Sequence, residues 1–358
     1  MTRQTSRWIF AVLAGALAAS NAVAGDVDAK GRDAATLDVP AMQVPFSVYA
    51  SAEARAAFLH NLQTRNDAPP LGGDIAASRA YYDKYNRDLL EKARRLYDVK
   101  IEHRRIGGVE TDVVTPAAGV AAANRHRVLI NLHGGAFLWG AGAGGQLEAT
   151  PIAALMGVEV VTVDYREGPE HHYPAASEDV AAVYRELLKT HDAKSIGIYG
   201  CSAGGILTAE SVAWLRHVGL PTPAAIGVFC GAGGGIDGDS LYMSAPLLGA
   251  PPVAPGNPMF MLGNWPYFNG ASVDDPLVAP VRSPETLRHF PPTLLISGTR
   301  DFMMSAVIHQ DNELVKAGVD TELHLWNGMW HAFFMDADLP ESREAYAVIV
   351  TFFERHLR

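Results

Sequence analysis

The chain has 358 residues, of which 48% are hydrophobic and 19% are charged, and its formal net charge is −10. The length and the apolar content are sufficient for a large buried core, and they fit one α/β domain with insertions. The negative charge argues against a nucleic-acid-binding protein, because such a protein needs a basic surface.

The first 24 residues have the pattern of a secretory signal peptide. Arg3 and Arg7 precede an apolar stretch, residues 8–19, and Ala22-Val23-Ala24 matches a small-residue cleavage site. The apolar stretch is too short for a comfortable transmembrane span, so we expect no stable membrane insertion. We therefore expect an exported protein, periplasmic or secreted, with a retained membrane anchor as the alternative.

Residues 25–98 contain two helical patterns, 50–62 and 74–97. From residue 99 onward, apolar strand-like runs alternate with helical stretches, which predicts an α/β fold with a mostly parallel sheet and helices on both faces. Helices are expected at 205–218, 304–317 and 341–356, and 101–106 is expected as an antiparallel edge strand. The other expected strands are 109–114, 128–132, 158–163, 195–199, 224–229, 292–297 and 321–326.

The pentapeptide Gly200-Cys201-Ser202-Ala203-Gly204 stands between an expected strand and an expected helix. This is the pattern of a nucleophile elbow, in which a tight turn exposes the serine Oγ and glycines tolerate the strained backbone. The N–H groups at the start of the helix favour an anionic intermediate there. Ser202 is the predicted nucleophile, and a plain glycine-rich turn is the alternative.

A serine nucleophile requires a general base, an acid that orients the base, and donors for the oxyanion. Asp301 follows the strand 292–297 and is the predicted acid, although it could instead cap the next helix. His331 follows the last strand and is the predicted base. The chain order Ser, Asp, His is the order of α/β-hydrolases.

The segment His133-Gly134-Gly135-Ala136-Phe137 follows the strand 128–132 and is similar to the oxyanion loop of lipases and esterases. We expect His133 to brace this loop. The predicted oxyanion hole consists of backbone N–H groups of Gly134, Gly135 or Ala136, together with the N–H of Ala203.

Three segments together resemble the bacterial esterases related to hormone-sensitive lipase, and the resemblance runs from about Val109 to the C-terminus. They are the elbow, the His-Gly-Gly-Ala-Phe loop and the segment Asp164-Tyr165-Arg166-Glu167-Gly168-Pro169-Glu170-His171-His172-Tyr173-Pro174-Ala175-Ala176. The resemblance implies an α/β-hydrolase fold and the triad of Ser202, Asp301 and His331. The chain departs from the family pattern at Ala136, at Cys201, at Glu167-Gly168 and at Phe302-Met303.

In this family, two regions outside the strand and helix alternation form a cap over the active site. The resemblance thus assigns residues 25–98 to an N-terminal cap segment and about 231–291 to a cap insertion in the catalytic domain 99–358. A long loop rich in aromatic residues and methionine is usually functional. Ordinary packing is the alternative for its residues. The predicted substrate contacts are Phe137, Trp265, Tyr267 and Phe268, with Met243, Met259 and Met261 as further candidates for the pocket walls.

These residues predict a serine carboxylesterase that acts on short- to medium-chain esters through an acyl-enzyme, with a small-molecule ester as its partner and no metal or organic cofactor. An amidase, a lactonase or a peptidase would use the same triad, and a non-catalytic binding protein on this scaffold is a further alternative. A homodimer is left open.

Two cysteines, Cys201 and Cys230, follow strands that we expect to be neighbours in the sheet. An exported protein folds in an oxidising compartment, so a disulfide between them is one alternative and two buried thiols are the other. The pair His171-His172 has no third ligand at a recognisable spacing, which argues against a metal site.

Overall fold

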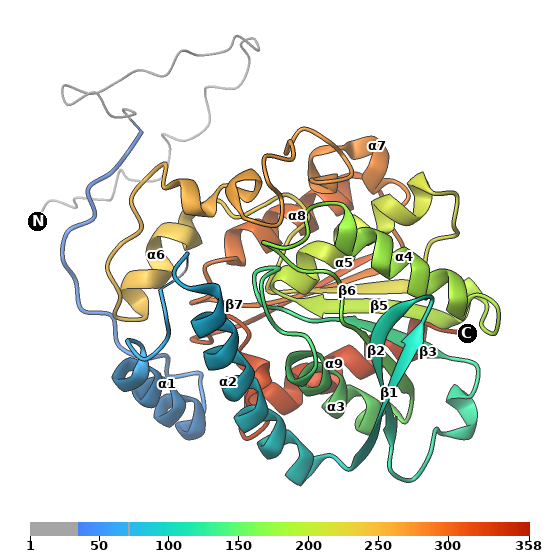
Figure 1. Ribbon diagram of the computed structural model, residues 1–358. Coiled ribbons are helices and arrows are strands. Elements are labelled where there is room, and N and C mark those ends of the chain that lie inside the picture. Colours follow the sequence, from blue (N-terminus) through green and yellow to red (C-terminus); the bar gives the residue numbers. More distant parts are fainter. Residues whose placement is uncertain (1–34, 71) are drawn as a thin grey trace, which may run out of the picture. The chain divides into compact units, whose positions relative to one another are not determined.

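The computed structural model describes residues 35–70 and 72–358 (Figure 1). The chain divides after Pro45 into two compact units, and the described helices and strands all belong to the second unit, Phe46–Arg358. The expected signal peptide, residues 1–24, lies outside the described residues. No helix in the described part of the chain is long and apolar enough to cross a membrane.

The second unit is built on an eight-stranded sheet in the order β1-β2-β4-β3-β5-β6-β7-β8. Strands β3 to β8 pair in parallel with their neighbours, whereas β2 is antiparallel to both β1 and β4. The strands are β1 Val99–Ile106, β2 Val109–Pro116, β3 Val128–Leu132, β4 Glu159–Val163, β5 Ile196–Cys201, β6 Ala225–Phe229, β7 Thr293–Gly298 and β8 Thr321–Trp326.

Helices cover both faces of the sheet (Figure 1). Helices α3 and α9 lie on one face, and α4, α5 and α8 lie on the other. The helices are α1 Ala52–Thr64, α2 Ile75–Leu96, α3 Ala143–Met156, α4 Ala175–Leu187, α5 Ala203–His217, α6 Asp239–Leu247, α7 Pro284–Leu287, α8 Met304–Lys316 and α9 Pro340–His356.

The side chains of the central strands fill two separate cores. In β3, Val128, Ile130 and Leu132 point into the core beneath α4, α5 and α8, and Leu129 points into the core beneath α3 and α9. All five residues of this strand are buried. A continuous apolar run is the pattern expected of a parallel strand that helices cover on both faces.

The α/β-hydrolase fold expected from the sequence is confirmed, with strand ends within two residues of the expected ones. One detail differs, because β2 is antiparallel to β4 and the edge of the sheet therefore has two antiparallel pairings. The region 231–291 contains the short helices α6 and α7 and three 3₁₀ turns. These elements are too short to show the regular spacing of apolar residues from which helices and strands are predicted.

Helix α2 packs on α3 and holds the loop that follows β3. Arg79 of α2 donates from Nε to the carbonyl oxygen of Leu138 at 2.8 Å and from a terminal nitrogen to that of Gly168 at 2.9 Å. The ring of Tyr82 stacks on that of Trp139 with a centroid distance of 4.5 Å. Helix α2 therefore restrains the segment that begins with the predicted oxyanion loop.

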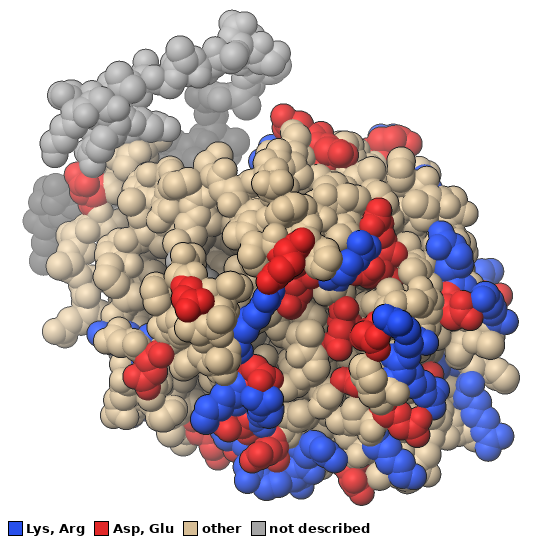
Figure 2. All heavy atoms as spheres, in the orientation of Figure 1, with Lys and Arg blue, Asp and Glu red and all other residues tan. Residues whose placement is uncertain are grey.

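On the face drawn in Figure 2, basic and acidic side chains are interspersed and form no continuous basic surface. Several basic and acidic side chains of the described residues are paired; Arg166, for example, approaches Glu178 and Asp179 at 2.9 Å each.

Candidate active site

Ser202 occupies a sharp turn between β5 and α5. Its backbone has φ 57° and ψ −120°, a conformation that a residue with a side chain rarely adopts. The N–H of Ser202 donates to the carbonyl oxygen of Phe229 at 2.8 Å, which holds the turn against β6. A Cβ atom on Gly204 would lie 1.7 Å from the carbonyl oxygen of Leu132, so only glycine allows α5 to approach the end of β3 so closely. The sequence therefore forms an elbow at the position expected.

The imidazole of His331 lies between Ser202 and Asp301. Its Nε2 atom is 2.9 Å from Oγ of Ser202, and its Nδ1 atom is 2.8 Å from Oδ1 of Asp301. A carboxylate only accepts hydrogen bonds, so Nδ1 carries the proton and Nε2 presents its lone pair to the serine hydroxyl. The structure thus brings together three side chains that are distant in the sequence, with the geometry of a general base between a hydroxyl and its orienting acid.

Asp301 is fully buried at the end of β7 and is held by several donors. Ser297 donates from Oγ to Oδ2 at 2.8 Å, and the N–H of Met303 donates to Oδ1 at 2.9 Å. Burial raises the pKa of Asp301, but the charge and hydrogen bond of His331, with the bonds from Met303 and Ser297, outweigh it and hold the pKa below its ordinary value. The carboxylate is therefore ionised and fixed in orientation.

Three backbone N–H groups of the two predicted oxyanion segments have no acceptor among the described residues: those of Gly135, Ala136 and Ala203. Gly134 differs, because its N–H donates to Oε1 of Glu148 at 2.9 Å. The structure therefore corrects the prediction for Gly134 and reduces the candidate oxyanion donors to the other three. Ala136 and Phe137 have φ angles of 55° and 59°, so two consecutive residues of the loop adopt a backbone conformation that is rare for residues other than glycine.

His133 braces this loop from inside the protein. Nδ1 of the ring lies 2.8 Å from the carbonyl oxygen of Gly134, and the ring stacks on Tyr165 with a centroid distance of 4.2 Å. The hydroxyl of Tyr165 donates to the main-chain oxygen of His133 at 2.7 Å. Burial lowers the pKa of His133 to about 4, so the ring is neutral near pH 7.

Phe137, Tyr267 and Phe268 are closed off from solvent. Phe137 stacks on Tyr267 with a centroid distance of 4.7 Å, and the hydroxyl of Tyr267 accepts the N–H of Ala176 at 2.8 Å. These three side chains were expected to contact substrate, but their burial indicates that they support the oxyanion loop instead. Trp265 is half-buried, so of the four predicted residues it is the one with a surface that a substrate can reach.

The other candidates for the pocket walls, Met243, Met259 and Met261, are exposed. A further aromatic ring lies closer to the base: the ring of Phe302 is 4.4 Å from that of His331. Phe302 stands where the sequence departs from the family pattern, and its half-buried ring contacts the imidazole directly.

Cys201 and Cys230 are free, buried thiols. Burial raises the pKa of each thiol. Among the described residues, one group has metal-ligating atoms close together: those of Cys230, Asp301 and His331 all lie within 4.8 Å of one another. Asp301 and His331 already bond to each other, and a raised thiol pKa opposes the thiolate that a metal ion would require. This arrangement favours proton transfer over metal binding.

Comparison with known proteins agrees with this geometry. The family model of the alpha/beta hydrolase fold matches residues 129–335. The "Putative acetyl-hydrolase LipR" of Mycobacterium tuberculosis (strain ATCC 25618 / H37Rv) is 31% identical over 270 residues, which cover 74% of this chain and 83% of that protein. An "Esterase" of Acinetobacter venetianus is 27% identical over 276 residues, covering 74% of this chain and 87% of that protein.

Two solved structures are similar over most of the chain. The crystal structure of esterase E25 has a TM-score of 0.75 and 30% identity, and the match covers 90% of this chain and 99% of that one. An esterase from the bacterial hormone-sensitive lipase family has a TM-score of 0.73 and 25% identity, with 86% and 100% covered. The chain belongs to the alpha/beta hydrolase fold family. The resemblance to bacterial esterases of the hormone-sensitive lipase family is confirmed, and with it the expected class of ester hydrolase.

One residue of the site, Glu148, was not predicted. An acidic residue inside the mostly apolar helical segment 143–156 was the available signal. What it binds depends on the path of the ten-residue connection between β3 and α3, which sequence periodicity does not reveal.

Proposed function

We propose that the protein is a serine carboxylesterase that hydrolyses short- to medium-chain esters through an acyl-enzyme. The observation that carries the proposal is the position of the His331 ring, which lies 2.9 Å from the Ser202 hydroxyl and 2.8 Å from the Asp301 carboxylate. The N–H groups of Gly135 and Ala136, in the loop after β3, and of Ala203, at the elbow, are the donors that we assign to the oxyanion that acyl transfer requires.

In the acylation step, Oγ of Ser202 attacks the ester carbonyl carbon while Nε2 of His331 takes the hydroxyl proton. The carbonyl oxygen becomes an oxyanion and accepts hydrogen bonds from the three backbone N–H groups. Asp301 stabilises the imidazolium and keeps its ring oriented. His331 then gives the proton to the departing alkoxide, so that the alcohol leaves and an acyl-Ser202 ester remains.

Deacylation repeats these steps with water. His331 removes a proton from a water molecule, the resulting hydroxide attacks the acyl carbon, and the same donors hold the second oxyanion. The proton then returns to Oγ of Ser202, which releases the carboxylic acid and restores the enzyme.

The acyl preference rests on the region 231–291 and on Ala136. The methyl group of Ala136 stands in the oxyanion loop, where it narrows the space beside the acyl carbon. The names of the relatives, an acetyl-hydrolase and esterases, support a short acyl chain. Amidase, lactonase and peptidase activities use the same triad, so the class of leaving group is decided by measurement.

A substrate panel with a nucleophile variant tests the proposal. We expect purified protein to hydrolyse p-nitrophenyl acetate and butyrate faster than the palmitate ester. We expect Ser202→Ala to lose at least ~10⁴-fold in kcat and to lose labelling by a fluorophosphonate. Labelling retained in Ser202→Ala would refute the assignment of the nucleophile. A ligand-binding protein without turnover would bind esters equally well with and without Ser202.

We also propose that the protein is exported, based on the pattern of residues 1–24. N-terminal sequencing of protein recovered from the periplasm or the medium of an expressing bacterium is expected to begin at Gly25. Recovery of the intact N-terminus in the membrane fraction would favour a retained anchor.

A further inference from the structure

Glu148 is an acidic side chain in the interior of helix α3, and the residue is 8% exposed. Its Oε1 atom accepts the N–H of Gly134 at 2.9 Å, and its Oε2 atom accepts Nδ2 of Asn131 at 2.9 Å. A third interaction, with the backbone of Cys201, also favours the ionised carboxylate. One carboxyl group therefore bonds both to the end of β3 and to the start of the predicted oxyanion loop.

These contacts lie next to the residues that carry the candidate oxyanion donors. Gly134 directly precedes Gly135 and Ala136, whose N–H groups are candidate oxyanion donors, and Cys201 precedes the turn that contains Ala203. The two groups of donors come from separate segments, and nothing in the covalent structure fixes their mutual distance. Catalysis is sensitive to such distances, because a displacement of about 1 Å costs on the order of 10²-fold in rate.

We propose that Glu148 is a positioning residue of the active site. By accepting the N–H of Gly134 and the amide of Asn131, it fixes the start of the oxyanion loop to the end of β3, which pairs with the strand that leads into the elbow, and so it sets the direction of the oxyanion donors. The proposal rests on the proposed function, since it assigns a role within that reaction.

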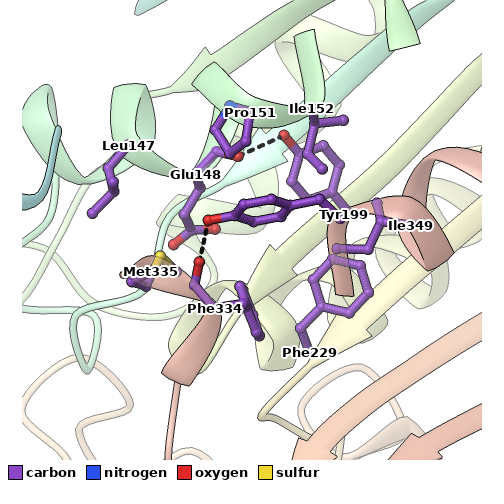
Figure 3. A pocket seen from close by; sticks show the side chains of 10 residues that line it. Leu147, Glu148, Pro151, Ile152, Tyr199, Phe229, Phe334, Met335 and Ile349 are labelled. Carbon is purple, nitrogen blue, oxygen red and sulfur yellow. Dashed lines mark hydrogen bonds between the residues drawn. The ribbon is translucent and has the colours of Figure 1, made fainter. Parts of the chain in front are cut away.

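The cost of placing a carboxyl group here argues that its contacts matter. Burial raises the pKa of Glu148 to about 8, although its bonds to Asn131, Gly134 and Cys201 oppose this shift. The residues around it are mostly apolar, as Figure 3 shows, and they line a cavity of about 10 Å³, roughly the space of one water molecule. The lining residues are Leu147, Glu148, Pro151, Ile152, Tyr199, Phe229, Phe334, Met335, Tyr346 and Ile349.

The main chain of Glu148 is anchored independently of its carboxyl group. The hydroxyl of Tyr199 donates to the main-chain oxygen of Glu148 at 3.3 Å, which is one of the dashed lines in Figure 3. The other dashed line joins the hydroxyl of Tyr346 to the carbonyl oxygen of Phe334. Helix α3 therefore keeps its attachment to β5 when the side chain at position 148 is changed, so its effect on the loop can be tested separately.

Three substitutions separate the roles of the carboxyl group. Glu148→Met has similar length but no acceptor for the N–H of Gly134. Glu148→Gln keeps an acceptor, and its new amide nitrogen can donate to Oδ1 of Asn131, which has no partner among the described residues, once the Asn131 amide turns over. Glu148→Asp keeps the acidic group but is one methylene too short to reach Gly134. The matched control is Thr150→Val in the same helix, because Thr150 is buried and its hydroxyl bonds only to the main-chain oxygen of Gln146.

Two readouts report on the oxyanion donors. The first is kcat and KM for p-nitrophenyl acetate. The second is the rate of labelling of Ser202 by a fluorophosphonate, which needs the nucleophile and the oxyanion donors but no ester substrate. We expect Glu148→Met and Glu148→Asp to lower kcat and the labelling rate by about 10- to 100-fold while KM changes less than about threefold. We expect Glu148→Gln and Thr150→Val to stay within about threefold of the wild type.

Each outcome bears on the proposal. Folded Glu148→Met and Glu148→Asp proteins with wild-type kcat and labelling rate would overturn it, and so would a Glu148→Gln protein as impaired as Glu148→Met. If Glu148→Met fails to fold, Glu148→Asp still decides the question because it keeps a polar group in the cavity. A wild-type protein that is neither labelled at Ser202 nor active on any ester would instead refute the proposed function, so the two failures are distinguishable.

Discussion

The backbone N–H of Ala332, the residue after His331, donates to Sγ of Cys230 at 3.3 Å. Ala332 has φ 55°, so the chain turns sharply at the point where it presents His331 to Ser202. The thiol of Cys230 therefore helps to hold a strained turn beside His331. Cys230 directly follows β6, so this contact connects the loop that carries His331 with the sheet.

This contact predicts that Cys230→Ala lowers kcat by about 3- to 10-fold, because the N–H of Ala332 loses its acceptor and the turn of His331 loosens. Cys230→Ser should retain more activity, since a hydroxyl oxygen also accepts. The measurement is kcat for p-nitrophenyl acetate in the three proteins. Equal rates in all three would show that the thiol has no part in holding the base.

The same two thiols are expected to resist modification in the native protein. Both are buried and both have a raised pKa, so little reactive thiolate forms near pH 8. Titration with a disulfide reagent under non-reducing conditions should find almost no thiol before denaturation and two per chain afterwards. Finding none after denaturation would instead indicate the disulfide that the sequence left as an alternative.

Asp301→Asn is expected to reduce kcat by about 10⁴-fold while the protein remains folded. An amide at this position can donate to Nδ1 of His331, which forces the proton onto Nε2 and removes the lone pair that faces Ser202. Folding is checked by circular dichroism and activity by the p-nitrophenyl acetate assay. A loss smaller than tenfold would show that the carboxylate does not orient the base.

The ionised carboxylate of Asp301 also stabilises the folded protein. Its pKa in the folded protein lies below the ordinary value of 3.8, so its ionised form stabilises the fold at every pH above 3.8. This contribution is lost as the pH falls through the folded-state pKa, and Asp301→Asn lacks it throughout. We expect the stability difference between wild type and variant in urea to narrow below pH 4, and a difference that is constant down to pH 2 would contradict this.

The ionisation of Glu167 has the opposite effect on the stability of the fold. Burial raises its pKa to about 7, although the charge of Arg79 opposes the shift. The ionised form is therefore disfavoured in the fold, and stability falls as the pH rises from about 4.5 through 7. Glu167→Leu removes this loss. The free energy of unfolding of the variant, relative to the wild type, should rise between pH 5 and 8 by up to about 3 kcal/mol.

Urea unfolding of the two proteins at pH 5, 6, 7 and 8 measures this difference. Glu167→Gln is the matched control, because it is polar but does not titrate, and it should show the same pH trend as the leucine variant. Arg79 keeps its ion pair with Glu170 at 2.8 Å in both variants, so helix α2 retains this attachment. A stability difference that is independent of pH would show that the Glu167 carboxyl group is not perturbed.

The parts of the site that lie on contiguous motifs were predictable from the sequence. Ser202 stands between an apolar strand and a helix, and Asp301 and His331 each follow a strand, so the shared carboxyl end of a parallel sheet brings them together. The contact of Glu148 with Gly134 was not predictable, because it depends on how an irregular connection returns a buried helix to the strand it left. The burial of Tyr267 and Phe268 also escaped prediction, since an aromatic residue in a long loop has the same sequence pattern whether it lines a pocket or fills a core.

Ala136 offers a test of acyl-chain selection within the oxyanion loop. Its φ of 55° lies in the left-handed region, where glycine is at no disadvantage, so Ala136→Gly keeps the backbone N–H and the fold. Removing the methyl group widens the space beside the acyl carbon. We expect kcat/KM for the octanoate ester to rise about 3- to 10-fold relative to the acetate ester, in proportion to the apolar area that a longer chain can then bury. The ratio of the two kcat/KM values in wild type and variant is the measurement, and an unchanged ratio would place the limit on chain length elsewhere, in the region 231–291.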